Sequence, residues 1–282
     1  MDYTQLAFEE NFLKPLPNLL WWEVRNEFHR AAQILAMMGR SFCPLHMEDE
    51  YATLSWDTEG KAMIGKWLNG AFRFEIDYWE YKLIIRRDEK VITTCQLVGK
   101  STLEILEEMK PILTNQGFEM GKLKMNYPYR DLPAEIADQN KKFSSLDLET
   151  VKAFTSWNDQ AYAILKAFTQ VHSNVSEIRC WPHHFDLAIL MTVNQEKNKT
   201  VGIGYVPADN HYDIPYFYLG PYPAPDAKLL PAHEGPGKWH TENWTGGILL
   251  SEELKGLSLP EQTKTFQSFY QHYLTALIDL LS

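Results

Sequence analysis

The chain has 282 residues and a mass of 32.8 kDa, about twice a typical domain length, so it can form one large domain or two modest ones. Hydrophobic residues make up 45% and charged residues 23%, which excludes a wholly disordered chain. Lys and Arg number 27 against 37 Asp and Glu, so the net charge is −10 and we expect no nucleic acid partner.

Four segments have the apolar periodicity of amphipathic helices. Gly39 follows the first and predicts its end, whereas Pro111 lies inside the second and should kink or shorten it. The second and the fourth each open with the S-x-x-E pattern of a capping box. These segments are residues 18–38, 101–117, 146–172 and 258–281.

Alternating or β-rich runs predict strands between these helices. Because helix, strands and helix occur in this order twice, we predict an α+β fold with antiparallel sheet flanked by amphipathic helices. We predict two pseudo-equivalent halves, 1–137 and 138–282, and as an alternative to separate domains the two halves share one core. The repetition fits either an internal duplication or the ordinary order of elements in an α+β chain. The predicted strands are 51–56, 62–67, 71–78, 81–86 and 91–97, then 177–193, 200–207, 214–219 and 245–251.

Signals for export or membrane insertion are missing from the sequence. The first residues lack the basic and apolar regions of a secretory signal, and no apolar run approaches the ~20 residues of a membrane span. The cysteines Cys43, Cys95 and Cys180 are odd in number and have no C-x-x-C spacing, which is typical of reduced, buried thiols. We therefore expect a soluble, cytoplasmic protein with no membrane partner.

The motif His184-x-Asp186 raises the question of a metal site. On a strand these two side chains would share one face, and together they form two thirds of a 2-His-1-carboxylate site for a divalent metal. His211, His233 or His240 could be the third ligand, and we take His184, Asp186 and His240 as the candidate set. The alternatives are that Asp186 only orients His184 through a structural hydrogen bond, or that both are ordinary polar surface residues.

The stretch from 205 to 240 is rich in aromatic residues and contains seven of the 15 prolines. Prolines exclude central strands, so we expect a stiff, ordered loop. Tyr and Trp combine an apolar body with a polar tip, as in the lining of small-molecule clefts, although the same loop could merely cover a sheet edge. The predicted cleft is walled by Trp181, His183, His184, Asp186, Tyr205, Tyr216, Tyr218, His240 and Trp244.

Several familiar enzyme motifs are absent. The segment 98–102 looks like the end of a phosphate-binding loop, but the glycine required at position 94 is Thr94. The chain contains no G-x-S-x-G and no H-E-x-x-H pattern. Nucleotide-dependent and common hydrolase activities therefore have no support in the sequence.

The order of several motifs resembles a bacterial protein family of unknown function. The resemblance includes Phe74 to Ile85, the signature Trp181-x-x-x-Phe185-Asp-Leu-Ala188, Pro215 to Pro223, and Trp239 to Leu250. It covers about three quarters of the chain, and the family signature does not require histidine at positions 183 and 184. The resemblance supports the architecture and implies no activity, cofactor or partner.

Three functional hypotheses follow. The first is a small-molecule-binding protein that uses the aromatic and histidine-lined cleft. The second is a metal-dependent enzyme that uses the His-x-Asp motif and a distant histidine. The third is an interaction scaffold without a ligand, which is favoured if the aromatic side chains pack in separate cores.

Overall fold

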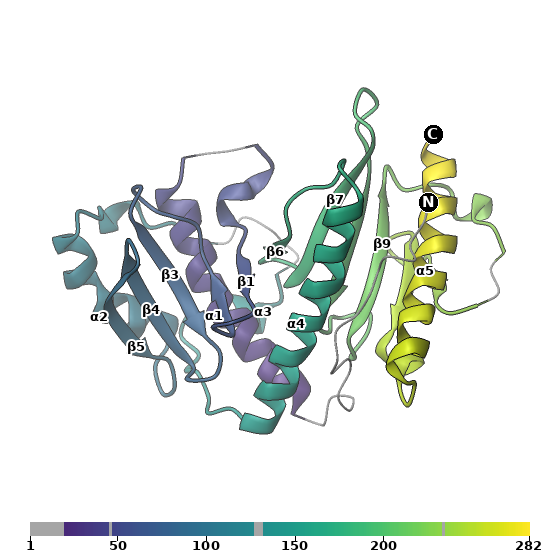
Figure 1. Cartoon of the computed structure of the whole chain (residues 1–282). Helices are drawn as coiled ribbons and strands as arrows, with labels where there is room; N and C mark the ends of the chain where they lie inside the picture. Colours follow the sequence, from purple (N-terminus) through teal and green to yellow (C-terminus); the bar gives the residue numbers. More distant parts are fainter. Residues whose placement is uncertain (1–19, 45–46, 127–131, 233–234) are drawn as a thin grey trace. The chain divides into compact units, whose positions relative to one another are not determined.

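The structure is a computed structural model that describes residues 20–44, 47–126, 132–232 and 235–282. Its helices and two antiparallel sheets confirm the α+β prediction (Figure 1). The chain divides into two compact units. The N-terminal unit holds the described residues up to Thr155 together with Cys180–Phe185, and the C-terminal unit holds Ser156–Arg179 and Asp186–Ser282. The division therefore falls inside a helix, α4 (Leu148–Val171), beyond the expected boundary after residue 137.

The N-terminal unit is built on a five-stranded meander in the order β1-β2-β3-β4-β5. Its helices are α1 (Trp21–Phe42), α2 (Thr102–Asn115) and the short α3 (Ala134–Ala137). Helix α1 packs against β3, and its Phe28 ring stacks on Tyr78 with the ring centroids 3.8 Å apart. The strands are β1 (Ser55–Asp57), β2 (Ala62–Ile64), β3 (Phe72–Asp77), β4 (Lys82–Arg87) and β5 (Lys90–Gln96).

The second sheet has six strands in the order β10-β11-β9-β8-β7-β6, of which β7 to β11 lie in the C-terminal unit. Helix α5 (Leu259–Leu281) packs against β7, β8, β9 and β11 (Figure 1). Its Phe266 ring meets Phe217 of β9 edge to face at 4.7 Å, so this face of the sheet holds the apolar core. The strands are β6 (Arg179–Trp181), β7 (Asp186–Asn194), β8 (Lys199–Val206), β9 (Tyr216–Tyr222), β10 (Lys238–His240) and β11 (Gly246–Leu250).

Local signals placed the helices well, with two differences. Both capping boxes form, and at the first the Ser101 N–H donates to Glu104 at 2.7 Å. Pro111 does not end α2, which continues to Asn115. Helix α1 continues through Gly39, where a Cβ would lie 2.2 Å from the backbone oxygen of Tyr51. Glycine is needed there for close packing rather than to stop the helix. The predicted start at residue 18 lies outside the described residues.

Several strand predictions need correction. The strand expected over 177–193 is interrupted by a turn between β6 and β7, and the one expected over 62–67 ends at Ile64. Residues 51–52 belong to a 3-10 helix, Met47–Ala52, so the strand expected over 51–56 begins only at Ser55. The proline-rich stretch is not all loop, because it contains β9 and β10. Pro221 fits in β9 because the pairing of β9 with β11 ends at Leu219, so at Pro221 only β8 is paired with the strand.

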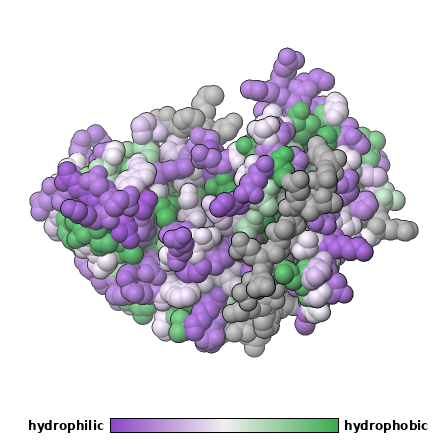
Figure 2. All heavy atoms as spheres, in the orientation of Figure 1, coloured by the Kyte–Doolittle hydropathy of each residue, from purple (hydrophilic) through white to green (hydrophobic). Residues whose placement is uncertain are grey.

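Hydrophilic residues occupy much of the surface visible in Figure 2, as the composition leads one to expect. Within the described ranges, no helix is both long and apolar enough to cross a membrane.

Candidate functional site

The two faces of the C-terminal sheet carry different kinds of side chain. Tyr205 pairs with Phe217 across β8 and β9, so it lies on the face covered by helices, where its ring stacks on Trp157 at 6.1 Å. Because side chains alternate along a strand, Tyr216 and Tyr218 lie on the opposite face. The prediction that Tyr205 lines the cleft is thus wrong, because Tyr205 belongs to the helix-covered core and is fully buried.

On the opposite face, Tyr218 reaches across β8 to the first residue of β7. Its hydroxyl donates to Asp186 Oδ2 at 2.6 Å. The ring passes directly over Gly204, where a Cβ would lie 2.5 Å from Tyr218 Cε1. A side chain at position 204 would therefore displace the ring from its hydrogen-bonding position.

A second phenol–carboxylate pair fixes the loop before β9. The Tyr216 hydroxyl donates to Asp209 Oδ2 at 2.6 Å. The other carboxylate oxygen, Oδ1, accepts the backbone N–H groups of His211 and Tyr212 at 2.8 and 3.0 Å. One carboxylate thus holds the turn that follows it and anchors this turn to the sheet.

His240 links this loop to Trp244. Its Nε2 lies 2.6 Å from the backbone oxygen of Glu242, which can only accept, so Nε2 carries the proton. The Tyr212 hydroxyl lies 2.8 Å from Nδ1 and donates to it when the ring is neutral. Trp244 stacks on the imidazole with the ring centroids 4.3 Å apart. Both nitrogens of His240 therefore already have protein partners.

These residues form one continuous group, which we call the tyrosine network. Burial raises the pKa of Tyr218, and the neighbouring Asp186 charge raises it further. Burial and Asp209 act in the same way on the pKa of Tyr216. Both phenols therefore stay protonated near neutral pH and act as hydrogen-bond donors. The network consists of Asp186, Asp209, Tyr212, Tyr216, Tyr218, His240 and Trp244.

The histidine-rich motif forms a tight turn rather than a strand. The N–H groups of Phe185 and His184 both donate to the Trp181 carbonyl, at 2.7 and 3.2 Å. Phe185 has a φ of 59°, a strained value for a bulky residue, of a kind found where surrounding contacts fix the backbone. The strand alternation that placed His184 on one face with Asp186 is thus wrong.

Two buried polar residues of α1 hold this turn, and the sequence analysis missed both. His29 Nε2 and Gln33 Nε2 lie 2.7 and 2.6 Å from the Pro182 carbonyl. The Phe185 ring stacks on His29 at 4.8 Å. Burial lowers the pKa of His29, so the ring is neutral. The available signal was the spacing of these two polar residues, i and i+4, which places them on one face of the helix.

The predicted metal site is not formed. Among the described residues, no three His, Cys, Asp or Glu side chains lie together in a group that could hold a metal ion. His240 is engaged at both nitrogens, and His184 lies in the turn. His184, Asp186 and His240 are therefore not a preformed ligand set, and His233 lies outside the described residues.

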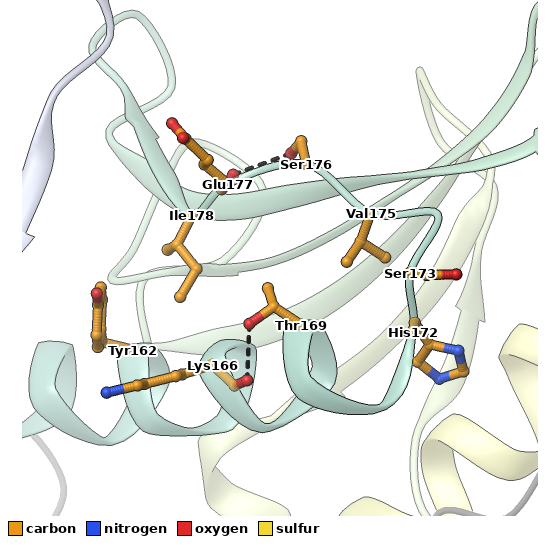
Figure 3. Close-up of a pocket in the computed structure, with 9 residues that line it drawn as sticks. All are labelled: Tyr162, Lys166, Thr169, His172, Ser173, Val175, Ser176, Glu177 and Ile178. Atoms are coloured by element: carbon orange, nitrogen blue, oxygen red, sulfur yellow. Dashed lines mark hydrogen bonds between the residues drawn. The ribbon is translucent and has the colours of Figure 1, made fainter.

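A pocket of about 580 Å³ lies elsewhere in the C-terminal unit, between α4 and the segment that follows it (Figure 3). This segment is held along β7, because the Ser176 N–H donates to the Leu190 carbonyl and the Leu190 N–H donates to Ser176 Oγ, both at 2.9 Å. Figure 3 shows Val175 and Ile178 directed toward the helix. The pocket is lined by Tyr162, Lys166, Thr169, His172, Ser173, Val175, Ser176, Glu177 and Ile178.

Sequence reasoning did not find this pocket, although it predicted the helix on one side of it. Of the nine predicted cleft residues, Asp186, Tyr216, Tyr218, His240 and Trp244 come together in the tyrosine network, and none lines the pocket. Trp181, His183 and His184 belong to the other unit.

No known family, curated protein or solved structure significantly matches this chain. The resemblance to a bacterial family stays a prediction.

Proposed function

We propose that this protein binds a small molecule in the pocket beside α4. The observation that carries the proposal is the pocket volume of about 580 Å³. Ligand-binding pockets usually have volumes of roughly 300–1,000 Å³. The site lies in the C-terminal half, where the sequence favours a cleft, but on different residues.

The lining has the mixed chemistry of a ligand site. Val175, Ile178 and the Tyr162 ring supply apolar walls. The Thr169 hydroxyl donates to the Lys166 carbonyl at 2.8 Å, while the Ser173 hydroxyl has no hydrogen bond within the described part of the chain. Polar groups beside an apolar wall can fix the orientation of a bound molecule.

The tyrosine network is a weaker candidate for ligand binding. Its phenols donate to Asp186 and Asp209, and His240 uses both nitrogens within the protein. A ligand there would have to replace hydrogen bonds that already exist, and an imperfect replacement costs affinity. We assign the network a structural role, in which it fixes the loops on that face of the sheet.

We also infer a cytosolic location. The cysteines Cys43, Cys95 and Cys180 are all free thiols. A reducing compartment keeps such thiols unpaired.

A ligand screen on the full chain, with two variants of α4, tests the proposal. Thr169→Phe fills the pocket, whereas Gln170→Phe adds the same group to the adjacent, exposed residue, which is not part of the lining. We expect ligand-observed NMR with a library of small metabolites to find binders of the wild type and of Gln170→Phe. These binders should fail to bind Thr169→Phe. A ligand at 100 times its Kd should stabilise the wild type by ~2.7 kcal/mol. If binders are absent, or bind Thr169→Phe equally well, the pocket is not the site.

A further inference from the structure

The lining of the pocket includes the exposed lysine Lys166. Its Nζ makes no hydrogen bond or ion pair with any of the described residues. By contrast, Lys152, earlier on the same helix, pairs with Glu149 at 2.8 Å. Figure 3 shows the Lys166 side chain running along the pocket wall toward Tyr162.

The other ionisable residues of the lining do not offset this cation inside the pocket. The Glu177 side chain is directed away from α4 (Figure 3). Burial lowers the pKa of His172, so its imidazole is neutral near pH 7. An ammonium group without an internal partner therefore lies at one end of walls that include Val175 and Ile178.

From this arrangement we propose that the ligand is a small organic anion with an apolar body. Its carboxylate binds the Lys166 ammonium, and its hydrocarbon part lies between Val175, Ile178 and the Tyr162 ring. This inference rests on the proposed function, since it specifies the ligand class of the same pocket. A neutral or cationic ligand of the same shape would leave the ammonium unpaired or repelled.

Three probes of equal length separate charge from shape: hexanoate, hexanamide and hexylammonium. We expect hexanoate to bind the wild type about five times more tightly than hexanamide, the upper value for a solvent-accessible ion pair. Hexylammonium should bind most weakly. Lengthening the acid to octanoate should tighten binding, by up to about fourfold for each methylene that becomes buried.

Lys166→Met removes the charge and keeps an unbranched apolar side chain. In this variant hexanoate and hexanamide should bind equally, with the affinity for hexanamide unchanged. Lys264→Met is the control, because Lys264 lies on α5, outside the pocket, and no hydrogen bond or ion pair with a described residue involves it. It should retain the fivefold preference, measured by isothermal titration calorimetry or by NMR chemical-shift titration.

The outcomes separate this inference from the proposed function. If hexanamide binds the wild type as tightly as hexanoate, or if Lys166→Met keeps the preference, the assignment of an anion is wrong. The assignment of an anion is also wrong if the library yields binders that Thr169→Phe blocks while no alkanoate binds. The pocket is then a binding site for another class of ligand. If nothing binds in a manner sensitive to Thr169→Phe, both proposals fail.

Discussion

The contact between Gly204 and the Tyr218 ring gives the sharpest test of the tyrosine network. In Gly204→Ala the new Cβ would lie 2.5 Å from Cε1 and 2.8 Å from the hydroxyl oxygen of Tyr218. The ring must then move, and the 2.6 Å hydrogen bond to Asp186 cannot be kept. Overpacking costs about 1–3 kcal/mol, and a hydrogen bond to a charged group contributes about 1.5–3 kcal/mol. We expect a loss of at least about 2.5 kcal/mol in the free energy of unfolding.

A matched control lies two residues away on the same strand and face. At Gly202 a Cβ would be 3.6 Å from Tyr218 Cε2, which is ordinary van der Waals contact. Gly202→Ala should therefore be neutral or stabilising by up to about 1 kcal/mol, since glycine weakens a strand through its backbone entropy. Urea unfolding followed by tryptophan fluorescence, with equal m-values, measures both variants.

A double-mutant cycle identifies the cause. In a Tyr218→Ala background the ring is gone, so Gly204→Ala should cost less than about 1 kcal/mol. The reasoning is refuted if Gly204→Ala and Gly202→Ala have equal stabilities. It is also refuted if the cost of Gly204→Ala is the same with and without the Tyr218 ring.

Two further predictions concern buried ionisable residues of the N-terminal unit. Burial lowers the pKa of His29, so below about pH 6.5 the unfolded chain takes up a proton that the folded chain does not. The free energy of unfolding is therefore unaffected by His29 above that pH and decreases as the pH falls below it, by up to about 1.4 kcal/mol per pH unit. His29→Gln should remove this pH dependence. Glu27 pairs with Arg30 at 2.8 Å, both buried, so Glu27→Gln leaves an uncompensated charge and should cost about 3–5 kcal/mol in urea unfolding.

Both predictions have controls in the same chain. The exposed His272→Gln should keep the pH dependence that His29→Gln loses, as measured by urea unfolding between about pH 5 and 7.5. The exposed Glu23→Gln, on the same helix as Glu27, should change stability by less than about 0.5 kcal/mol. A pH slope that persists in His29→Gln, or a stable Glu27→Gln, contradicts the assigned burial.

The sequence alone was sufficient for the elements whose signals are local. The capping boxes at Ser101 and Ser258 mark helix starts because each side chain bonds a backbone group within the same turn. The alternation over β3 predicts a strand that places Phe72, Phe74 and Ile76 on one face, and all three are buried. Both the pattern and its structural consequence lie within a few residues.

The composition of the candidate cleft was only partly decided by local patterns. The sequence grouped Tyr205 with Tyr216 and Tyr218, but the pairing of β8 with β9 places Tyr205 on the other face. A one-residue change of register would reverse this. The turn at Phe185 likewise depends on contacts with His29 and the rest of α1, far away in the sequence.

The pocket depends on tertiary structure entirely. Its wall residues Tyr162 and Lys166 look like ordinary positions of an amphipathic helix, and Val175 and Ile178 like ordinary residues of an extended segment. They form a pocket because the pairing of Ser176 with Leu190 holds that segment along β7, close to α4. Periodicity and caps are properties of neighbouring residues and can be read from the sequence, whereas a cavity depends on where separate elements stop packing together.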